Sequence, residues 1–163
     1  MRGAKVIGTV STPAKAAEAK RAGADEVINY ATHDFEAEVR RITDGKGIQV
    51  AYDAVGKTTF DKSLACLAQR GMLILYGQAS GAVPPFDLVR LGGPLSLFVT
   101  RPSLAAYTAT RQELVQRANE VLGWVSAGKL KVKVDSTFRL AEAPQAHTRL
   151  EGRASSGKIL LVP

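Results

Sequence analysis

Short apolar runs and amphipathic segments alternate along the first part of the chain. The apolar runs have the length of buried strands and lie at Lys5–Val10, Glu26–Asn29, Ile48–Ala54, Gly71–Tyr76 and Leu95–Thr100. Between them, apolar residues recur at helical spacing in the segments 13–23, 34–42 and 60–68. Strands that alternate with helices over short connections are typical of a parallel α/β sheet.

Helix boundaries are marked most clearly in the first helical segment. Ser11 or Thr12 can cap its N-terminus, and Pro13 suits the first helical position because proline has no N–H to satisfy there. Gly23 can end this helix in a left-handed conformation. For the second helical segment, the same reasoning predicts a cap within the Thr-His pair at 32–33.

The last third of the chain has a different pattern of predicted helices and strands. It predicts a single long helix from Leu104 to Ala127, a strand over Leu130–Leu140, a helix over Glu142–Leu150 and a terminal strand over Lys158–Val162. We therefore expect residues 1–128 to form a partial nucleotide-binding domain and residues 129–163 to form a C-terminal strand–helix–strand segment.

Composition favours an ordinary globular protein. The chain has 163 residues, of which 45% are hydrophobic and 23% charged, enough for one domain with a substantial core. No apolar run is long enough to span a bilayer and the first residues do not form a signal peptide, so a cytoplasmic protein without a membrane partner is expected. Cys66 is expected to be a buried small hydrophobe, and no Cys or His pair has the spacing of a metal motif.

A formal net charge of +7 could favour anionic partners. The basic residues are spread along the chain, whereas nucleic-acid binding usually requires a concentrated patch. The nearest candidate is Lys129–Lys133, where period 2 would place three lysines on one strand face, and a solvated face explains it better. We therefore expect no nucleic-acid partner.

Candidate chemistry lies where the predicted strands end, because ligands of open parallel sheets bind across the carboxyl ends of the strands. Ser11, Thr12 and Lys15 follow the first strand, at a place where an Asp or Glu would hold the ribose 2′-hydroxyl of NAD. Two hydroxyls and a cation at a helix N-terminus instead suit a 2′-phosphate, which indicates NADPH. An ordinary N-cap followed by a solvated lysine explains the same residues, and both interpretations stay open at this point.

One element of such a fold is missing from the sequence. No Gly-x-Gly-x-x-Gly turn occurs, although a dinucleotide-binding sheet carries one after its first strand. The sequence therefore predicts a partial doubly wound, Rossmann-like α/β sheet that lacks its first βα unit.

Several motifs in fixed order carry a family resemblance over essentially the whole chain. They are Ile7–Ala17, Gly23–Tyr30, Val50–Gly56, Gly77–Gly81, Phe98–Ser103 and Gly157–Val162. Together they resemble the C-terminal half of a zinc-independent quinone oxidoreductase, from the zeta-crystallin-like branch of the medium-chain dehydrogenase/reductase superfamily. The resemblance implies NADPH-dependent reduction of quinones or related α,β-unsaturated carbonyls such as enals and enones.

The resemblance also implies roles for individual residues. The cofactor-binding set would be Ser11, Thr12 and Lys15 at the adenosine 2′-phosphate, Tyr30 at the adenine-ribose end, Val55 at the adenosine site, Gly77, Gln78, Ala79 and Ser80 near the middle of the cofactor, Phe98, Val99 and Thr100 beside the nicotinamide, and Arg153 reaching back from a late loop. A homodimer that pairs through Leu95–Thr100 is implied as well. The segment 129–163 would pack on the catalytic domain of the family.

The chain departs from the family by lacking that N-terminal catalytic domain. The family residues that orient the quinone lie mostly there, so no catalytic residue is assigned. We expect the isolated chain to be inactive, and either to associate, to rearrange its strands or to belong to something larger, because unpaired strand edges promote association. The alternative function is a nucleotide-binding or assembly module without turnover.

Overall fold

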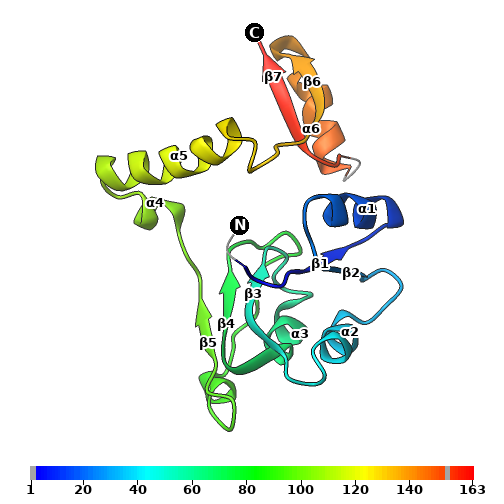
Figure 1. Cartoon of the computed structure of the whole chain (residues 1–163), viewed down its shortest axis with the longest axis vertical. Helices are drawn as coiled ribbons and strands as arrows, with labels where there is room; N and C mark the ends of the chain where they lie inside the picture. The colour runs from blue at the N-terminus through cyan, green and yellow to red at the C-terminus, as the bar shows by residue number, and fades with distance from the viewer. Residues whose placement is uncertain (1–2, 153–154) are drawn as a thin grey trace. The chain divides into compact units, whose positions relative to one another are not determined.

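The computed structural model describes residues 3–152 and 155–163. They form two compact units, one over Ala4–Leu114 and one whose main part is Val115–Pro163 (Figure 1). The predicted domain division at residue 128 stays a prediction, whereas the compact units divide after Leu114, inside a helix. Among the described residues, no helix combines the length and the apolarity that crossing a bilayer requires.

The first unit alternates strands and helices, as the sequence predicts. Its elements are β1 (Ile7–Val10), α1 (Pro13–Arg21), β2 (Glu26–Asn29), α2 (Phe35–Ile42), β3 (Ile48–Asp53), α3 (Phe60–Ala65), β4 (Leu67–Leu75), the 3₁₀ helix η1 (Leu88–Leu91), β5 (Phe98–Thr100) and α4 (Leu104–Tyr107). Helix α5 (Arg111–Ser126) begins in this unit and continues into the second.

The strands of the first unit form two parallel sheets. β1 pairs with β2, and a separate sheet has the order β3-β4-β5. In a doubly wound sheet of order 3-2-1-4-5-6, β1 and β2 take the places of strands 2 and 3, and β3 to β5 take those of strands 4 to 6. The place of the first strand, between β1 and β3, has no occupant among the described residues. The predicted partial doubly wound sheet is confirmed.

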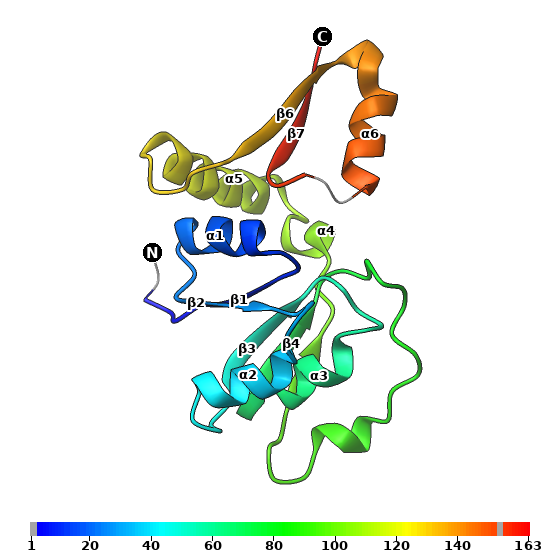
Figure 2. The same cartoon turned by 90° about the vertical axis from the view of Figure 1, so that its right-hand side faces the viewer.

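Helices cover these sheets from different sides. α1 and α2 lie on opposite faces of the β1-β2 sheet (Figure 2). α3 packs on the second sheet through a core cluster that includes Phe60, Leu64 and the fully buried Leu73. A smaller cluster of Ile28, Val39 and Cys66 joins β2 and α2 to the end of α3, and Cys66 is buried, as predicted.

The predicted helix over residues 60–68 is wrong at its end. α3 stops at Ala65, and β4 begins two residues later at Leu67, opposite Ile48. The register of β4 then shifts between Leu67 and Met72, at a bulge that contains Arg70 at φ 57° and Gly71. A Cβ at Gly71 would lie 2.8 Å from the carbonyl oxygen of Ala68, so only glycine fits this bulge.

Two predicted helix boundaries also differ from the structure. Asp34, rather than the predicted pair at 32–33, caps α2, and its carboxylate accepts hydrogen bonds from the N–H groups of residues 36 and 37. The predicted long helix from Leu104 is broken between α4 and α5. A capping box causes the second start, because the Thr110 hydroxyl accepts from Glu113 N at 3.2 Å while the Glu113 carboxylate accepts from Thr110 N at 3.1 Å.

The second unit contains most of α5, β6 (Val134–Arg139), the 3₁₀ helix η2 (Leu140–Glu142), α6 (Ala143–Glu151) and β7 (Lys158–Val162). β6 and β7 pair in parallel, so the predicted strand–helix–strand segment is present. Its first strand is shorter than predicted, since residues 130–133 precede β6, and the three lysines of 129–133 do not share a strand face. Asp135 holds the unit together by accepting from Arg149 Nε at 2.7 Å and from Ser156 N at 2.9 Å.

Candidate functional site

The carboxyl end of β1 leads directly into the N-terminus of α1. The Thr12 hydroxyl caps the helix by accepting from Lys15 N at 3.2 Å, and Pro13 occupies the first turn, as predicted. This use of its oxygen leaves the hydroxyl hydrogen of Thr12 able to donate to a ligand. The first turn contains no acidic residue, so nothing there opposes the attraction of a helix N-terminus for an anion.

The end of β2 lies beside the end of β1. Tyr30 N donates to the carbonyl oxygen of Val10 at 2.9 Å, which places Tyr30 next to the connection that carries Ser11 and Thr12. The Tyr30 side chain is about half exposed, at 52%. The structure therefore places the four residues predicted for the adenosine end just beyond the carboxyl ends of β1 and β2: Ser11, Thr12, Lys15 and Tyr30.

At the end of β3, the structure gives Asp53 a role that the sequence alone does not assign to it. Asp53 is 4% exposed, and its Oδ1 accepts from Val55 N at 2.8 Å and from Gly56 N at 3.0 Å. The hydroxyls of Thr59 and Ser63 both donate to its Oδ2 at 2.8 Å. The carboxylate thus fixes the turn that carries Val55 and joins it to α3.

The environment of Asp53 favours its charged form. Burial raises the pKa of the carboxyl, but the hydrogen bonds from Gly56 N, Thr59, Ser63 and Val55 N outweigh this effect, and the pKa lies below its ordinary value. A buried carboxylate with its lone pairs satisfied is a structural anchor. The spacing of Asp53, Gly56 and Thr59 could have indicated this role, since a short acidic side chain often accepts from backbone N–H groups two and three residues ahead.

The loop after β4 is bound tightly to the turn after β3. Ala79 N donates to the Ala54 carbonyl at 3.1 Å, and Ser80 N donates to the Val55 carbonyl at 2.8 Å. A Cβ at Gly77 would lie 2.4 Å from the Ala54 carbonyl oxygen, so the two backbones approach too closely for any other residue at 77. Val55 and Gly77–Ser80, all predicted cofactor residues, therefore form one rigid pair of loops at the carboxyl ends of β3 and β4.

The three residues predicted beside the nicotinamide form β5 itself. Phe98, Val99 and Thr100 pair with Met72, Leu73 and Ile74 of β4. The strand is shorter than the predicted Leu95–Thr100, because residues 95–97 lie in the connection before it. Phe98 is 54% exposed, so it lies on an uncovered part of the sheet.

The predicted residues of the first unit thus fall into two groups, one on each sheet. Arg153 lies outside the described residues. Within residues 3–152 and 155–163, no group of three or more His, Cys, Asp or Glu side chains could hold a metal ion, and the expectation of a zinc-independent protein stays a prediction.

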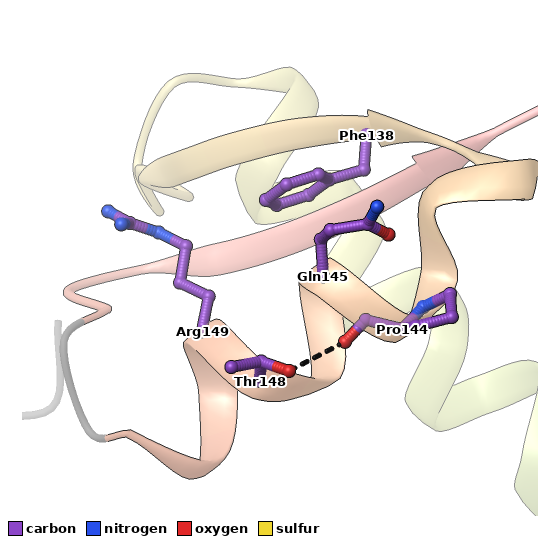
Figure 3. A pocket seen from close by; sticks show the side chains of 5 residues that line it. All are labelled: Phe138, Pro144, Gln145, Thr148 and Arg149. Atoms are coloured by element: carbon purple, nitrogen blue, oxygen red, sulfur yellow. Dashed lines mark hydrogen bonds between the residues drawn. The ribbon is translucent and has the colours of Figure 1, made fainter.

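The second unit has a shallow hollow of its own (Figure 3). Phe138, Pro144, Gln145, Thr148 and Arg149 line it, and Thr148 Oγ1 donates to the Pro144 carbonyl at 2.9 Å. Its only charged side chain, Arg149, is already paired with Asp135. Of the predicted site residues that the structure describes, none lines the hollow, and we assign no ligand to it.

Comparisons with known proteins support the family that the sequence motifs resemble. The sequence model described as zinc-binding dehydrogenase matches residues 22–161. The chain is 45% identical over 163 residues to Quinone oxidoreductase 1 of Escherichia coli (strain K12), covering 99% of this chain and 50% of that protein. It is 48% identical over 162 residues to a 2-haloacrylate reductase of Burkholderia sp., covering 99% and 49%.

The backbone is similar to solved structures over the same extent. A crystal structure of the Escherichia coli quinone oxidoreductase complexed with NADPH matches with a TM-score of 0.93 at 45% identity, covering 99% of this chain and 50% of that one. The chain therefore spans about half the length of the relatives that it matches.

Proposed function

This chain belongs to the zinc-binding dehydrogenase family and matches the C-terminal half of its quinone oxidoreductases, and we propose that it carries the adenosine 2′-phosphate side of an NADPH site. Ser11, Thr12 and Lys15 would hold the 2′-phosphate, and Tyr30 would lie against the adenine-ribose end. Val55 and Gly77–Ser80 would follow the cofactor toward β5, where Phe98, Val99 and Thr100 would flank the nicotinamide. We keep Arg153 as a further contact.

The observation that carries this proposal is the junction of β1 and α1. A helix N-terminus without acidic residues follows directly on a strand end, and its cap is a hydroxyl. In an NAD site an acidic residue near this place accepts a hydrogen bond from the ribose 2′-hydroxyl. Its negative charge would repel a 2′-phosphate. Similar structures support the choice, since an Escherichia coli quinone oxidoreductase and a mycobacterial relative were each crystallised with NADPH.

The reaction that we propose for the whole site is reduction of quinones or related α,β-unsaturated carbonyls. Relatives named quinone oxidoreductase and 2-haloacrylate reductase support this reaction, since a quinone and an acrylate both carry a C=C bond conjugated to a carbonyl or carboxyl group. The cofactor supplies the hydride, and a protein contributes its placement and the exclusion of water. In this chain, the hydrogen-bonded loops after β3 and β4 would provide the rigid part of that placement.

We assign no catalytic residue to this chain, so a second function without catalysis is also proposed. A nucleotide-binding or assembly module without turnover would use the same residues. β5 is the outer strand of its sheet. With either function, we propose a homodimer that pairs through the predicted segment Leu95–Thr100.

Calorimetric titration of the chain with NADPH and with NADH tests the proposal, followed by addition of 1,4-benzoquinone to the same sample. We expect NADPH to bind more tightly than NADH, and no oxidation of NADPH by this chain alone. Equal affinities for the two cofactors would contradict the 2′-phosphate site. Turnover on benzoquinone would show that this half assembles a working site and would exclude the module without turnover.

A further inference from the structure

The carboxyl ends of the strands in the first unit carry few acidic side chains, and those present serve the fold. The connections that follow β1, β3 and β5 contain no acidic residue. After β2 and β4, Asp34 and Asp87 each accept hydrogen bonds from N–H groups at the start of the next helix. Asp53, at the end of β3, is buried and engaged by the donors described above. An anion at this edge of the sheets therefore meets little electrostatic repulsion.

Arg101 is an exposed cation at this edge. It directly follows Thr100, the last residue of β5, and the parallel register pairs Thr100 with Ile74 of β4. Because β4 continues for one residue beyond Ile74, Arg101 begins the connection to α4 beside the end of β4, near the loop that contains Gly77–Ser80. In the described part of the chain, the Arg101 side chain makes no hydrogen bond or ion pair.

The fold uses other arginines of the first unit in a different way. Four of them each pair with a carboxylate: Arg21, Arg40, Arg41 and Arg90. Arg70 is exposed, but it lies in the bulge of β4, toward the amino end of that strand. Ligands of open parallel sheets bind at the carboxyl ends instead. Arg101 thus combines a ligand-binding position with a guanidinium whose donors are available.

The backbone around Arg101 is restrained on both sides. Thr100 is hydrogen-bonded into β5, and Pro102 disfavours the helical conformation for the residue that precedes it. Ser103 is extended, at φ −114° and ψ 130°, and its carbonyl oxygen accepts from Ala106 N at 3.1 Å as α4 begins. The connection therefore fixes the backbone of Arg101 next to the end of β5.

The carbonyl compounds of the proposed reaction differ in charge. A quinone is neutral, whereas an α,β-unsaturated acid such as acrylate carries a carboxylate at neutral pH. Reduction of its C=C bond adds a hydride, supplied by NADPH, to the β-carbon and a proton from water to the α-carbon. Between these additions, the electron pair of the C=C bond is shared with a carboxylate that is already negative. A cation at the carboxylate lowers the energy of that state.

We propose that Arg101 binds the carboxylate of an α,β-unsaturated acid and thereby makes this site selective for anionic substrates. Arginine suits this role because its planar guanidinium can donate two parallel hydrogen bonds to a carboxylate. The proposal rests on the proposed function, which puts Phe98, Val99 and Thr100 of β5 beside the nicotinamide. The next residue along the chain then lies where the substrate meets the cofactor.

NMR titrations of the ¹⁵N-labelled chain with acrylate and with acrylamide, each with and without NADPH, test the proposal. The two compounds have nearly the same shape and differ in charge. We expect acrylate to bind at least about fivefold more tightly, with its largest chemical-shift changes at the amides of Thr100 and Arg101.

Arg101→Gln should reduce this preference to less than about twofold, because the charge is lost. Arg101→Lys should keep part of it, since a lysine retains the charge but not the paired donors. Arg70→Gln is the matched control, because it removes the same charge from an exposed arginine near the other end of β4 and should leave the preference unchanged. Circular dichroism checks that the three variants fold alike.

No binding of acrylate, equal binding of acrylate and acrylamide, or equal loss of the preference in Arg101→Gln and Arg70→Gln would overturn the proposal. Weaker NADPH binding in Arg101→Gln with an unchanged preference for acrylate would also overturn it, because the guanidinium would then serve the cofactor. The proposed function fails in a different way. A chain that prefers acrylate through Arg101 but binds NADPH no more tightly than NADH would contradict the 2′-phosphate site and leave the carboxylate site intact.

Discussion

The Ser80 hydroxyl donates a hydrogen bond of 2.7 Å to the carbonyl oxygen of Val55 and accepts one of 3.1 Å from Thr58 N. Ser80 thus connects the loop after β4 to the turn after β3 at two points, Val55 and Thr58. Its hydroxyl oxygen is engaged within the protein. In the proposed cofactor site, Ser80 would therefore act mainly by fixing Val55, while Gly77 to Ala79 would bring the backbone close to the cofactor.

The close approach of these loops makes Gly77 intolerant of a side chain. Gly77→Ala would place a Cβ at 2.4 Å from the Ala54 carbonyl oxygen, and because that atom is backbone, one loop must move. We expect a loss of about 1–3 kcal/mol in the free energy of unfolding, as for other overpacked sites. Urea denaturation measures it. Gln78→Ala, one residue along and exposed, should change this free energy by less than about 0.5 kcal/mol, and a similar loss in both variants would contradict the account.

A substitution of Asp53 tests the same pair of loops. In Asp53→Asn, one of the two oxygens becomes an NH₂ group, which cannot accept the hydrogen bonds that Asp53 receives from backbone and hydroxyl donors. We expect a loss of about 1–3 kcal/mol in the free energy of unfolding, the cost of leaving buried polar groups unsatisfied. Asp61→Asn is the control, because Asp61 makes only an exposed ion pair with Arg90. Equal stability of the two variants would show that Asp53 is not an anchor.

Acid should destabilise the second unit through Asp135. The hydrogen bond from Arg149, then that from Ser156 N, hold the pKa of Asp135 well below its ordinary value. A carboxyl with a depressed pKa in the folded state stabilises the fold above its unfolded pKa, about 3.9, and loses that contribution as the pH falls toward the folded value. We therefore expect the stability of this unit to decrease as the pH falls below about 4.

Trp124 reports on this unit, because it is the one tryptophan of the chain and lies in α5. Its fluorescence should follow acid unfolding, and Asp135→Asn should be less stable at neutral pH and lose the acid dependence that the pair causes. Glu151→Gln, an exposed carboxylate at the end of α6, serves as the control and should keep it. An unchanged acid profile in Asp135→Asn would contradict the role of the pair.

Local signals account for what the sequence predicts correctly. The bounds of β2 and β7 agree with the structure, and Thr12, Pro13 and Gly23 mark α1 as expected, with Gly23 at φ 104°. Each of these features depends on neighbouring residues alone. The parallel pairing of the strands also follows from the alternation of strands and helices.

The errors have two physical origins. Apolar spacing continued across residues 108–110 and concealed the break, although Thr110 and Glu113 have the spacing of a capping box. The sequence does not predict the role of Asp53, because this role depends on donors from α3 as well as from the adjacent turn. The start of β4 at Leu67 depends on pairing with Ile48. Contacts of this kind arise only when separate segments pack together.

We expect the charge at the start of α1 to decide which adenosine ligand binds. Lys15→Glu would place a negative charge where a 2′-phosphate is expected, so it should weaken ligands that carry this phosphate at least tenfold and leave ligands without it nearly unchanged. Lys46→Glu is the matched control, because Lys46 is exposed in the turn before β3 and changes the net charge equally. An equal effect of both variants would mean that only the overall charge matters.

The most direct test of the account is a calorimetric titration of the chain with adenosine 2′,5′-bisphosphate and with adenosine 5′-monophosphate. These two ligands differ only in the 2′-phosphate, and neither requires the pyrophosphate turn. We expect the chain to bind the bisphosphate at least tenfold more tightly than the monophosphate. Lys15→Glu should remove this difference in affinity. Equal affinity of the chain for the two ligands would contradict the central claim that the junction of β1 and α1 recognises the 2′-phosphate of NADPH.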